Sequence, residues 1–186
     1  MISDTLRAPL RLPLWAHAGV ALVAFGLFQA TKALLDASYA ASMHPVDYAT
    51  GQTSFDAAQI ERWYASMQDQ GTLAVYVQTQ VIDFGFIASV MLLGLMLGTL
   101  AARLGRAGSW GRMIGVVAAG LAIAGACMDV IENLLSFLML ADPQSIPQFL
   151  AVIYSAAAAA KFALLTMAMA GLLLSLIFGA ASRIRG

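Results

Sequence analysis

Long apolar runs alternate with polar connections along this chain of 186 residues. Four such runs lie at about 12–37, 73–102, 112–141 and 146–181, and no proline stands beyond the first turn of any of them. A helix needs about 20 mainly apolar residues to cross the hydrocarbon core of a bilayer, and each run reaches that length. The pattern predicts an all-α polytopic membrane protein, a four-transmembrane-helix bundle that forms a single transmembrane domain over 1–186.

The connection between the first two runs is the longest and has a helical pattern of its own. Its apolar residues recur at helical spacing: Phe55, Ile60, Trp63, Tyr64 and Met67. Thr53 and Asp56 form a cap signal before them, and Gly71 favours a helix end after them. We expect a short amphipathic helix over about 54–70, which lies on the membrane or caps the mouth of the bundle. An interfacial surface helix is favoured over a functional lid.

Arginines predict the orientation of the chain. They gather on one side of a four-span topology: Arg7, Arg11, Arg103, Arg106, Arg112, Arg183 and Arg185. Short loops rich in Lys and Arg stay on the cytoplasmic side of a membrane. We therefore expect a multi-pass protein of the cell inner (cytoplasmic) membrane, with both termini in the cytoplasm and the long connection outside.

Composition agrees with a membrane protein and excludes some functions. Hydrophobic residues make up 61% of the chain and charged residues 11%, against about 25% charged residues in a typical soluble domain. The net charge of zero argues against a nucleic-acid partner, because phosphate binding needs a basic surface. With one cysteine and two histidines, we expect no metal site and no cofactor.

Five ionisable residues inside the four runs fall at one height. They are Lys32, Asp83, Asp129, Glu132 and Lys161. Each lies 17 to 22 residues from an arginine of the cytoplasmic side, which corresponds to ~26–33 Å of helix. This layer is predicted near the outer boundary of the hydrocarbon.

Small residues in the third run indicate that the layer faces inward. Steps of four and three residues join Gly111, Gly115, Ala118, Ala122, Gly125, Asp129 and Glu132. Small residues at this spacing mark close approach between membrane helices, so Asp129 and Glu132 continue a packing face. Charged side chains that faced lipid would be costly, which also favours an inward cluster.

Negative charge is in excess in this layer. Its two lysines, Lys32 and Lys161, carry two positive charges. Its four carboxyl groups would carry four negative charges: Asp36, Asp83, Asp129 and Glu132. Either one or two carboxyls carry a proton near neutral pH, or a cation binds among them. We expect Asp83, Asp129 and Glu132 to be candidates for acid/base chemistry. The candidate ligand-binding residues are Asn133, Lys161, Lys32, Asp36, Gln80, Tyr76 and Tyr154.

Several functions are open at this point. The favoured one is an outward-facing polar pocket that binds a lipid or small amphiphile, with or without isomerase-like acid/base chemistry. The alternatives are a charged layer that only locks helix packing, in a structural or accessory subunit of a membrane complex, and a proton- or cation-coupled carrier. For Lys32 and Asp36 an ordinary i,i+4 surface pair is the simpler explanation. Expected partners are membrane lipids, a small amphiphile, and a second copy or larger membrane complex.

The segment Asp129-Val-Ile-Glu132-Asn133 resembles a D-x-x-E-N motif in the third helix of a set of bacterial four-helix integral membrane proteins. That set also has an acid in the second helix and a lysine in the fourth, where this chain has Asp83 and Lys161. The resemblance implies a site at these residues and names no activity.

A more distant resemblance, in architecture, is to the EXPERA-type proteins, the group of the sterol isomerase and the sigma-2 receptor. Asp36, the Trp63-Tyr64 pair and Asp83 fall in similar places. The resemblance implies a four-helix bundle with a ligand cavity. No histidine stands beside these acids in the sequence, so it does not imply sterol-isomerase chemistry.

Overall fold

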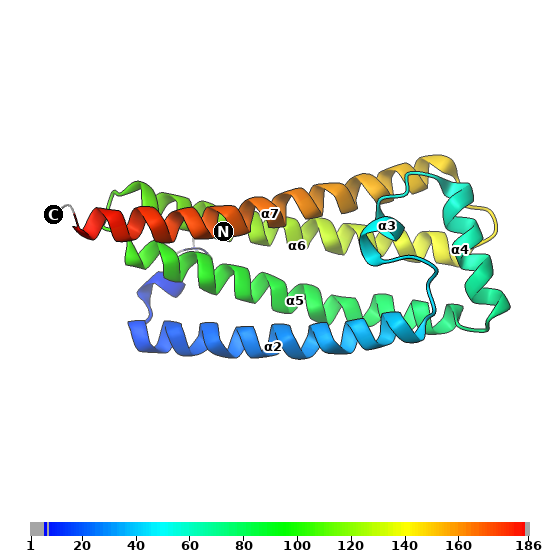
Figure 1. Cartoon of the computed structure of the whole chain (residues 1–186), viewed down its shortest axis with the longest axis horizontal. Coiled ribbons are helices and arrows are strands. Elements are labelled where there is room, and N and C mark those ends of the chain that lie inside the picture. Colours follow the sequence, from blue (N-terminus) through cyan, green and yellow to red (C-terminus); the bar gives the residue numbers. More distant parts are fainter. Residues whose placement is uncertain (1–5, 7, 185–186) are drawn as a thin grey trace. The chain divides into compact units, whose positions relative to one another are not determined.

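The computed structural model describes residue 6 and residues 8–184. Along these residues run one short 3-10 helix and six α-helices, with no strand between them (Figure 1). The 3-10 helix is η1 (Pro9–Arg11), and the α-helices are α2 (Leu14–Ala41), α3 (Tyr48–Gln52), α4 (Ala57–Asp69), α5 (Leu73–Leu104), α6 (Trp110–Ala141) and α7 (Gln148–Ile184). Arg7 and Arg185, used above to predict the orientation, lie outside the described residues.

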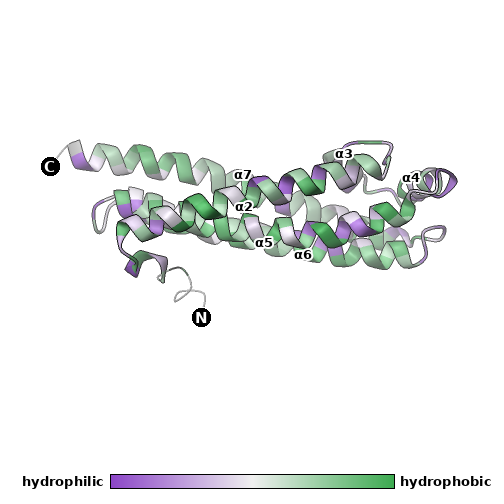
Figure 2. Ribbon diagram, turned by 90° about the horizontal axis from the view of Figure 1, so that it is seen from below, coloured by the Kyte–Doolittle hydropathy of each residue, from purple (hydrophilic) through white to green (hydrophobic). Residues whose placement is uncertain are grey.

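Four of these helices are long and apolar enough to cross a membrane. The spans are Leu14–Ala41, Leu73–Leu104, Trp110–Ala141 and Gln148–Arg183. Large hydrophobic side chains such as Leu22, Met169 and Ile177 are exposed on them, and Figure 2 shows hydrophobic residues along all four. Exposed apolar surface of this extent suits contact with lipid. The predicted all-α class with four candidate membrane spans is confirmed, and it indicates a multi-pass membrane protein.

The chain divides into two compact units. The first unit contains Met1–Phe28, Ala88–Ala126 and Ala163–Gly186, and the second contains Gln29–Ile87 and Cys127–Phe162. Each unit has its own way of joining its helices.

In the first unit, α5, α6 and α7 approach one another at small residues. A Cβ atom added to Gly98 would lie 2.7 Å from the backbone nitrogen of Ala119, and one added to Gly111 would lie 2.6 Å from that of Gly179. The Ser175 hydroxyl donates to the Gly111 carbonyl oxygen at 2.7 Å. Glycine is required at such points because any side chain would separate the helices. The predicted small-residue face of α6 is thus a packing face.

A buried histidine joins α2 to α5 in the same unit. His17 is fully buried, and its Nε2 lies 3.1 Å from the Met96 carbonyl oxygen. That oxygen can only accept, so Nε2 donates to it. Arg103 donates to the Leu12 carbonyl oxygen at 2.6 Å, beside the His17 ring. His17 therefore has a packing role.

In the second unit, α4 covers the ends of α5 and α7. Its buried residues Ile60, Tyr64 and Met67 belong to one apolar cluster with Tyr76 of α5 and Tyr154 of α7. The Asp56 side chain accepts from the Gln59 backbone nitrogen at 3.3 Å and caps the helix, whereas Thr53, the other residue of the predicted cap signal, ends α3. The apolar face of α4 is thus buried against the unit itself.

The entry to α4 differs from the prediction in one respect. Phe55, counted among the apolar positions of the helix, lies before it with a positive φ of 56° and an exposed side chain. A non-glycine residue rarely adopts this conformation. Two bonds to α7 hold it: Phe55 donates its N–H to the Ser155 hydroxyl at 3.0 Å and accepts from the Gln148 amide at 2.8 Å. Tertiary contacts therefore set where this helix begins.

The small-residue packing predicts a sharp difference between two glycines of α6. At Gly115 an added Cβ would lie 2.7 Å from both the Ala102 nitrogen and the Ser175 hydroxyl oxygen, whereas at Gly120 it would meet nothing within 4 Å. We expect Gly115→Ala to lower the free energy of unfolding by about 1–3 kcal/mol. The matched Gly120→Ala should leave it unchanged. Denaturant titration in detergent micelles, followed by circular dichroism, measures both, and equal losses would contradict this packing.

Candidate functional site

Lys161 of α7 is the centre of a buried polar network in the second unit. Its Nζ donates to Asp129 Oδ1 at 2.9 Å, to Glu132 Oε2, and to Gln52 Oε1 of α3 at 3.0 Å. An ammonium group has three donors, so these three acceptors satisfy it completely. Asp129 and Glu132 lie one turn apart on α6, which is why one lysine reaches both. We call Asp83, Asp129, Glu132, Asn133 and Lys161 the Lys161 network.

Asp83 joins α5 to this network through an amide. The Asn133 side-chain nitrogen of α6 donates to Asp83 Oδ2 at 2.8 Å. Asp83 is buried and makes no salt bridge within residues 8–184. Three buried carboxyl groups therefore share the single ammonium of Lys161. An uncompensated charge is costly in a buried site, so this imbalance calls for a proton or a positively charged or donating group.

Four buried polar atoms around the network have no hydrogen-bond partner within the part of the chain that the structure describes. They are Gln80 Oε1, Glu132 Oε1, Asn133 Oδ1 and Ser136 Oγ. The first three can only accept a hydrogen bond, unless Glu132 is protonated. Buried polar atoms of native proteins are nearly always paired, so several unpaired atoms close in sequence need a reason. Three of the four atoms are thus acceptors without a donor, while the Ser136 hydroxyl can donate or accept.

Three buried tyrosines adjoin the network. The Tyr154 hydroxyl lies next to Glu132 and Tyr76, and the hydroxyl of Tyr64, from α4, lies next to Ser136. Burial raises the pKa of Tyr64 above its usual range, so its hydroxyl keeps its proton. The tyrosines bring hydroxyl groups to one side of the network, while their rings form part of its apolar surroundings.

The structure brings together most of the predicted site residues. Those buried in the second unit are Asp83, Asp129, Glu132, Asn133, Lys161, Gln80, Tyr76 and Tyr154. Lys32 and Asp36 are outside this set, because their side chains are 49% and 50% exposed and pair with each other. This is the i,i+4 surface pair given above as the simpler explanation. The catalytic and ligand-binding roles assigned to all these residues stay predictions.

Sequence reasoning missed three participants in this region. Gln52 contacts Lys161 although 109 positions separate them, Ser136 is buried with an unpaired hydroxyl, and the His44 ring packs 5.2 Å from that of Tyr76. Ser136 follows Glu132 by four residues, so helical spacing alone was a signal for it. No periodicity points to Gln52 or His44, because both come from the irregular connection before α4.

Comparison of the chain with protein families, curated proteins and solved structures found no match. Among the described residues, no group of three or more His, Cys, Asp or Glu side chains is arranged to hold a metal ion. The chemistry of the Lys161 network therefore has to be argued from its own geometry.

Loss of the central lysine should be far more damaging than loss of an exposed one. Lys161→Met removes the only cation from a site with three buried carboxyl groups, and breaking such a pair costs about 3–5 kcal/mol. Lys32→Met, which breaks an exposed pair, should cost about 0–1 kcal/mol. Chemical unfolding in detergent compares the two variants directly. If both lose the same stability, the ion pairs of Lys161 do not support the fold.

The burial of His44, in the segment between α2 and α3, predicts that the stability of the protein depends on pH. Burial lowers the pKa of His44 below its ordinary value of 6.5. The unfolded chain then binds a proton more readily than the folded one, so stability is complete above the unfolded pKa and is lost as the pH falls toward the folded pKa. We expect the free energy of unfolding to fall as the pH drops below about 6.5. The fall should be smaller in His44→Gln, and an identical pH profile in that variant would contradict the assignment.

Proposed function

We propose that this protein binds a small amphiphile or lipid in the membrane, and that the ligand's polar head donates hydrogen bonds into the Lys161 network. The observation that carries the proposal is the surplus of acceptors there: Gln80 Oε1, Glu132 Oε1 and Asn133 Oδ1 are buried without a donor. A ligand that supplies donors would pair these atoms and offset the excess of carboxyl groups. Intramembrane ionisable residues also mark ligand or ion sites more often than not.

The ligand class follows from what the network still offers. Lys161 already has three acceptors, so it has no free donor for a carboxylate or phosphate. An ammonium, amide or hydroxyl head fits the acceptors better. The rings of Phe84 and Phe137 stack with their centroids 6.3 Å apart. In this proposal they would contact the apolar part of the ligand. The resemblance to EXPERA-type proteins, which implies a ligand cavity in a four-helix bundle, also supports a lipid-like ligand.

Acid/base chemistry is a further part of this proposal. Glu132 and Asp129 lie beside an ammonium group, and the Tyr154 hydroxyl lies beside Glu132. Such a set can give a proton to one carbon atom of a ligand and remove one from another, as double-bond isomerisation requires. Glu132 is the candidate for this transfer because one of its oxygens is occupied by Lys161 and the other is unpaired.

A purely structural role is the second candidate, and a specific observation favours it. The ion pairs of Lys161 connect α7 to α6 and its hydrogen bond to Gln52 connects α7 to α3, while the bond between Asp83 and Asn133 connects α5 to α6. Interhelical polar contacts of this kind stabilise membrane helices modestly. If that is their whole purpose, the network binds nothing else.

The arginines support an orientation for this site. Five described arginines belong to the first unit: Arg11, Arg103, Arg106, Arg112 and Arg183. No described residue of that unit is acidic. By the positive-inside rule we place both termini and the connection between α5 and α6 in the cytoplasm, in the inner membrane. The segment that carries α3 and α4 then lies outside, and the ligand would enter from that side.

Native mass spectrometry of the protein extracted in mild detergent tests ligand binding. We expect an adduct of a few hundred daltons or more on the wild-type chain, reduced at least tenfold by Glu132→Gln, a loss of about 1.4 kcal/mol or more. Asp36→Asn is the matched control, since it removes an exposed carboxylate and should keep the adduct. An adduct that Glu132→Gln retains, or no adduct in any variant, would overturn the proposal in favour of the structural role.

A further inference from the structure

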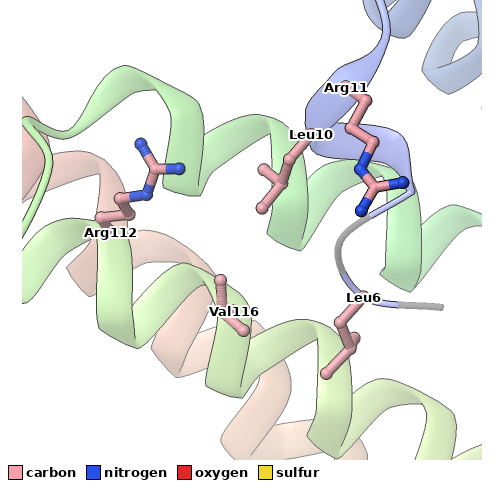
Figure 3. A pocket seen from close by; sticks show the side chains of 5 residues that line it. All are labelled: Leu6, Leu10, Arg11, Arg112 and Val116. Carbon is pink, nitrogen blue, oxygen red and sulfur yellow. The ribbon is translucent and has the colours of Figure 1, made fainter. Parts of the chain in front are cut away.

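A cavity of about 460 Å³ lies in the first unit, between η1 and the start of α6. Its lining residues are Leu6, Leu10, Arg11, Arg112 and Val116. In Figure 3, Arg11 and Arg112 stand apart, with Leu10 and Val116 between them. The volume is within the range of small-molecule sites. The cavity thus combines two cationic groups with an apolar floor.

The two guanidinium groups are available to a ligand. Arg103 and Arg183, also in this unit, donate to the carbonyl oxygens of Leu12 and Leu104 at 2.6 and 2.7 Å. Neither Arg11 nor Arg112 has a side-chain hydrogen bond or salt bridge to another described residue. The described part of the first unit also contains no Asp or Glu to neutralise them. The cavity is therefore complementary to an anion.

Two tryptophans indicate the depth of this cavity in a membrane. Trp15 follows η1 directly and Trp110 opens α6, and their side chains are 79% and 71% exposed. Tryptophans favour the level of the lipid headgroups, where an amphipathic ring meets both water and hydrocarbon. Arg112 is two residues from Trp110 and Arg11 is four from Trp15. The arginines thus belong to the stretch of chain that should lie among the headgroup phosphates.

We infer that this cavity binds an anionic phospholipid. The anionic headgroup would bind on the arginine side of the cavity, because guanidinium groups bind phosphate through paired hydrogen bonds. The acyl chains would pass over Leu10 and Val116. Basic pockets of membrane proteins on the cytoplasmic side bind anionic headgroups in this manner. This site uses none of the residues of the Lys161 network.

Lipid titration by native mass spectrometry tests the inference on the intact chain. Delipidated protein in detergent is titrated with dioleoyl phosphatidylglycerol and, separately, with dioleoyl phosphatidylcholine. We expect phosphatidylglycerol to bind at least fivefold more tightly. The variant Arg11→Gln/Arg112→Gln should lose at least tenfold in affinity for it. Arg106→Gln is the control with one charge removed from the same connection but outside the cavity, and it should change the affinity less than twofold.

The apolar half of the site has its own variant. Val116→Phe fills the apolar floor of the cavity without changing any charge, and we expect it to weaken phosphatidylglycerol binding at least threefold. In a separate competition experiment on the wild-type protein, inorganic phosphate at millimolar concentration should not displace the lipid. Each variant is accepted only with an unchanged melting temperature, and Arg11→Gln alone, at an exposed position, provides the test if the double variant does not fold. Equal affinity for both lipids, an equal loss in Arg106→Gln, or effective competition by free phosphate would overturn the inference.

Discussion

The absence of water from a bilayer is the constraint on which this structure depends. A polar group in hydrocarbon must find its partner within the protein, which is why spanning segments are helices whose backbone bonds are internal. The same constraint acts on side chains. His17 pairs with backbone of α5 in the first unit, and Lys161 gathers three acceptors in the second. The polar side chains of the long helices accordingly find partners far away in the sequence.

The two units meet this constraint differently. The first relies mainly on glycine and alanine where α5, α6 and α7 meet, so that backbones such as those of Gly98 and Ala119 come close together, and it buries His17 between α2 and α5. The second buries polar groups, and covers them with the apolar face of α4, including Tyr64 and Met67. Close packing of small residues leaves little room for a ligand where α5, α6 and α7 meet in the first unit, whereas a polar network with unpaired acceptors has a reason to bind one. The proposed amphiphile site therefore belongs to the second unit.

The Lys161 network and its surroundings are not fully paired. Its cation is saturated, while three carboxyl or amide oxygens of Gln80, Glu132 and Asn133 stay without a donor. A network built only to lock helices would gain most by pairing every member, since a partly satisfied network costs more than an apolar core. In our proposal, the three unpaired acceptors are what favours a binding role over a purely structural one.

By itself the sequence determined the features that depend on local periodicity. The four spans and the small-residue face of α6 follow from residues a few positions apart, whose relation in a helix is geometric. The buried position of Asp129 and Glu132 follows as a continuation of that face. Only the tertiary structure decided the partners. Gln52 reaches Lys161 across 109 positions, and Lys32 pairs with Asp36 outside the network, because pairing depends on which helix surfaces meet and no spacing along the chain encodes that.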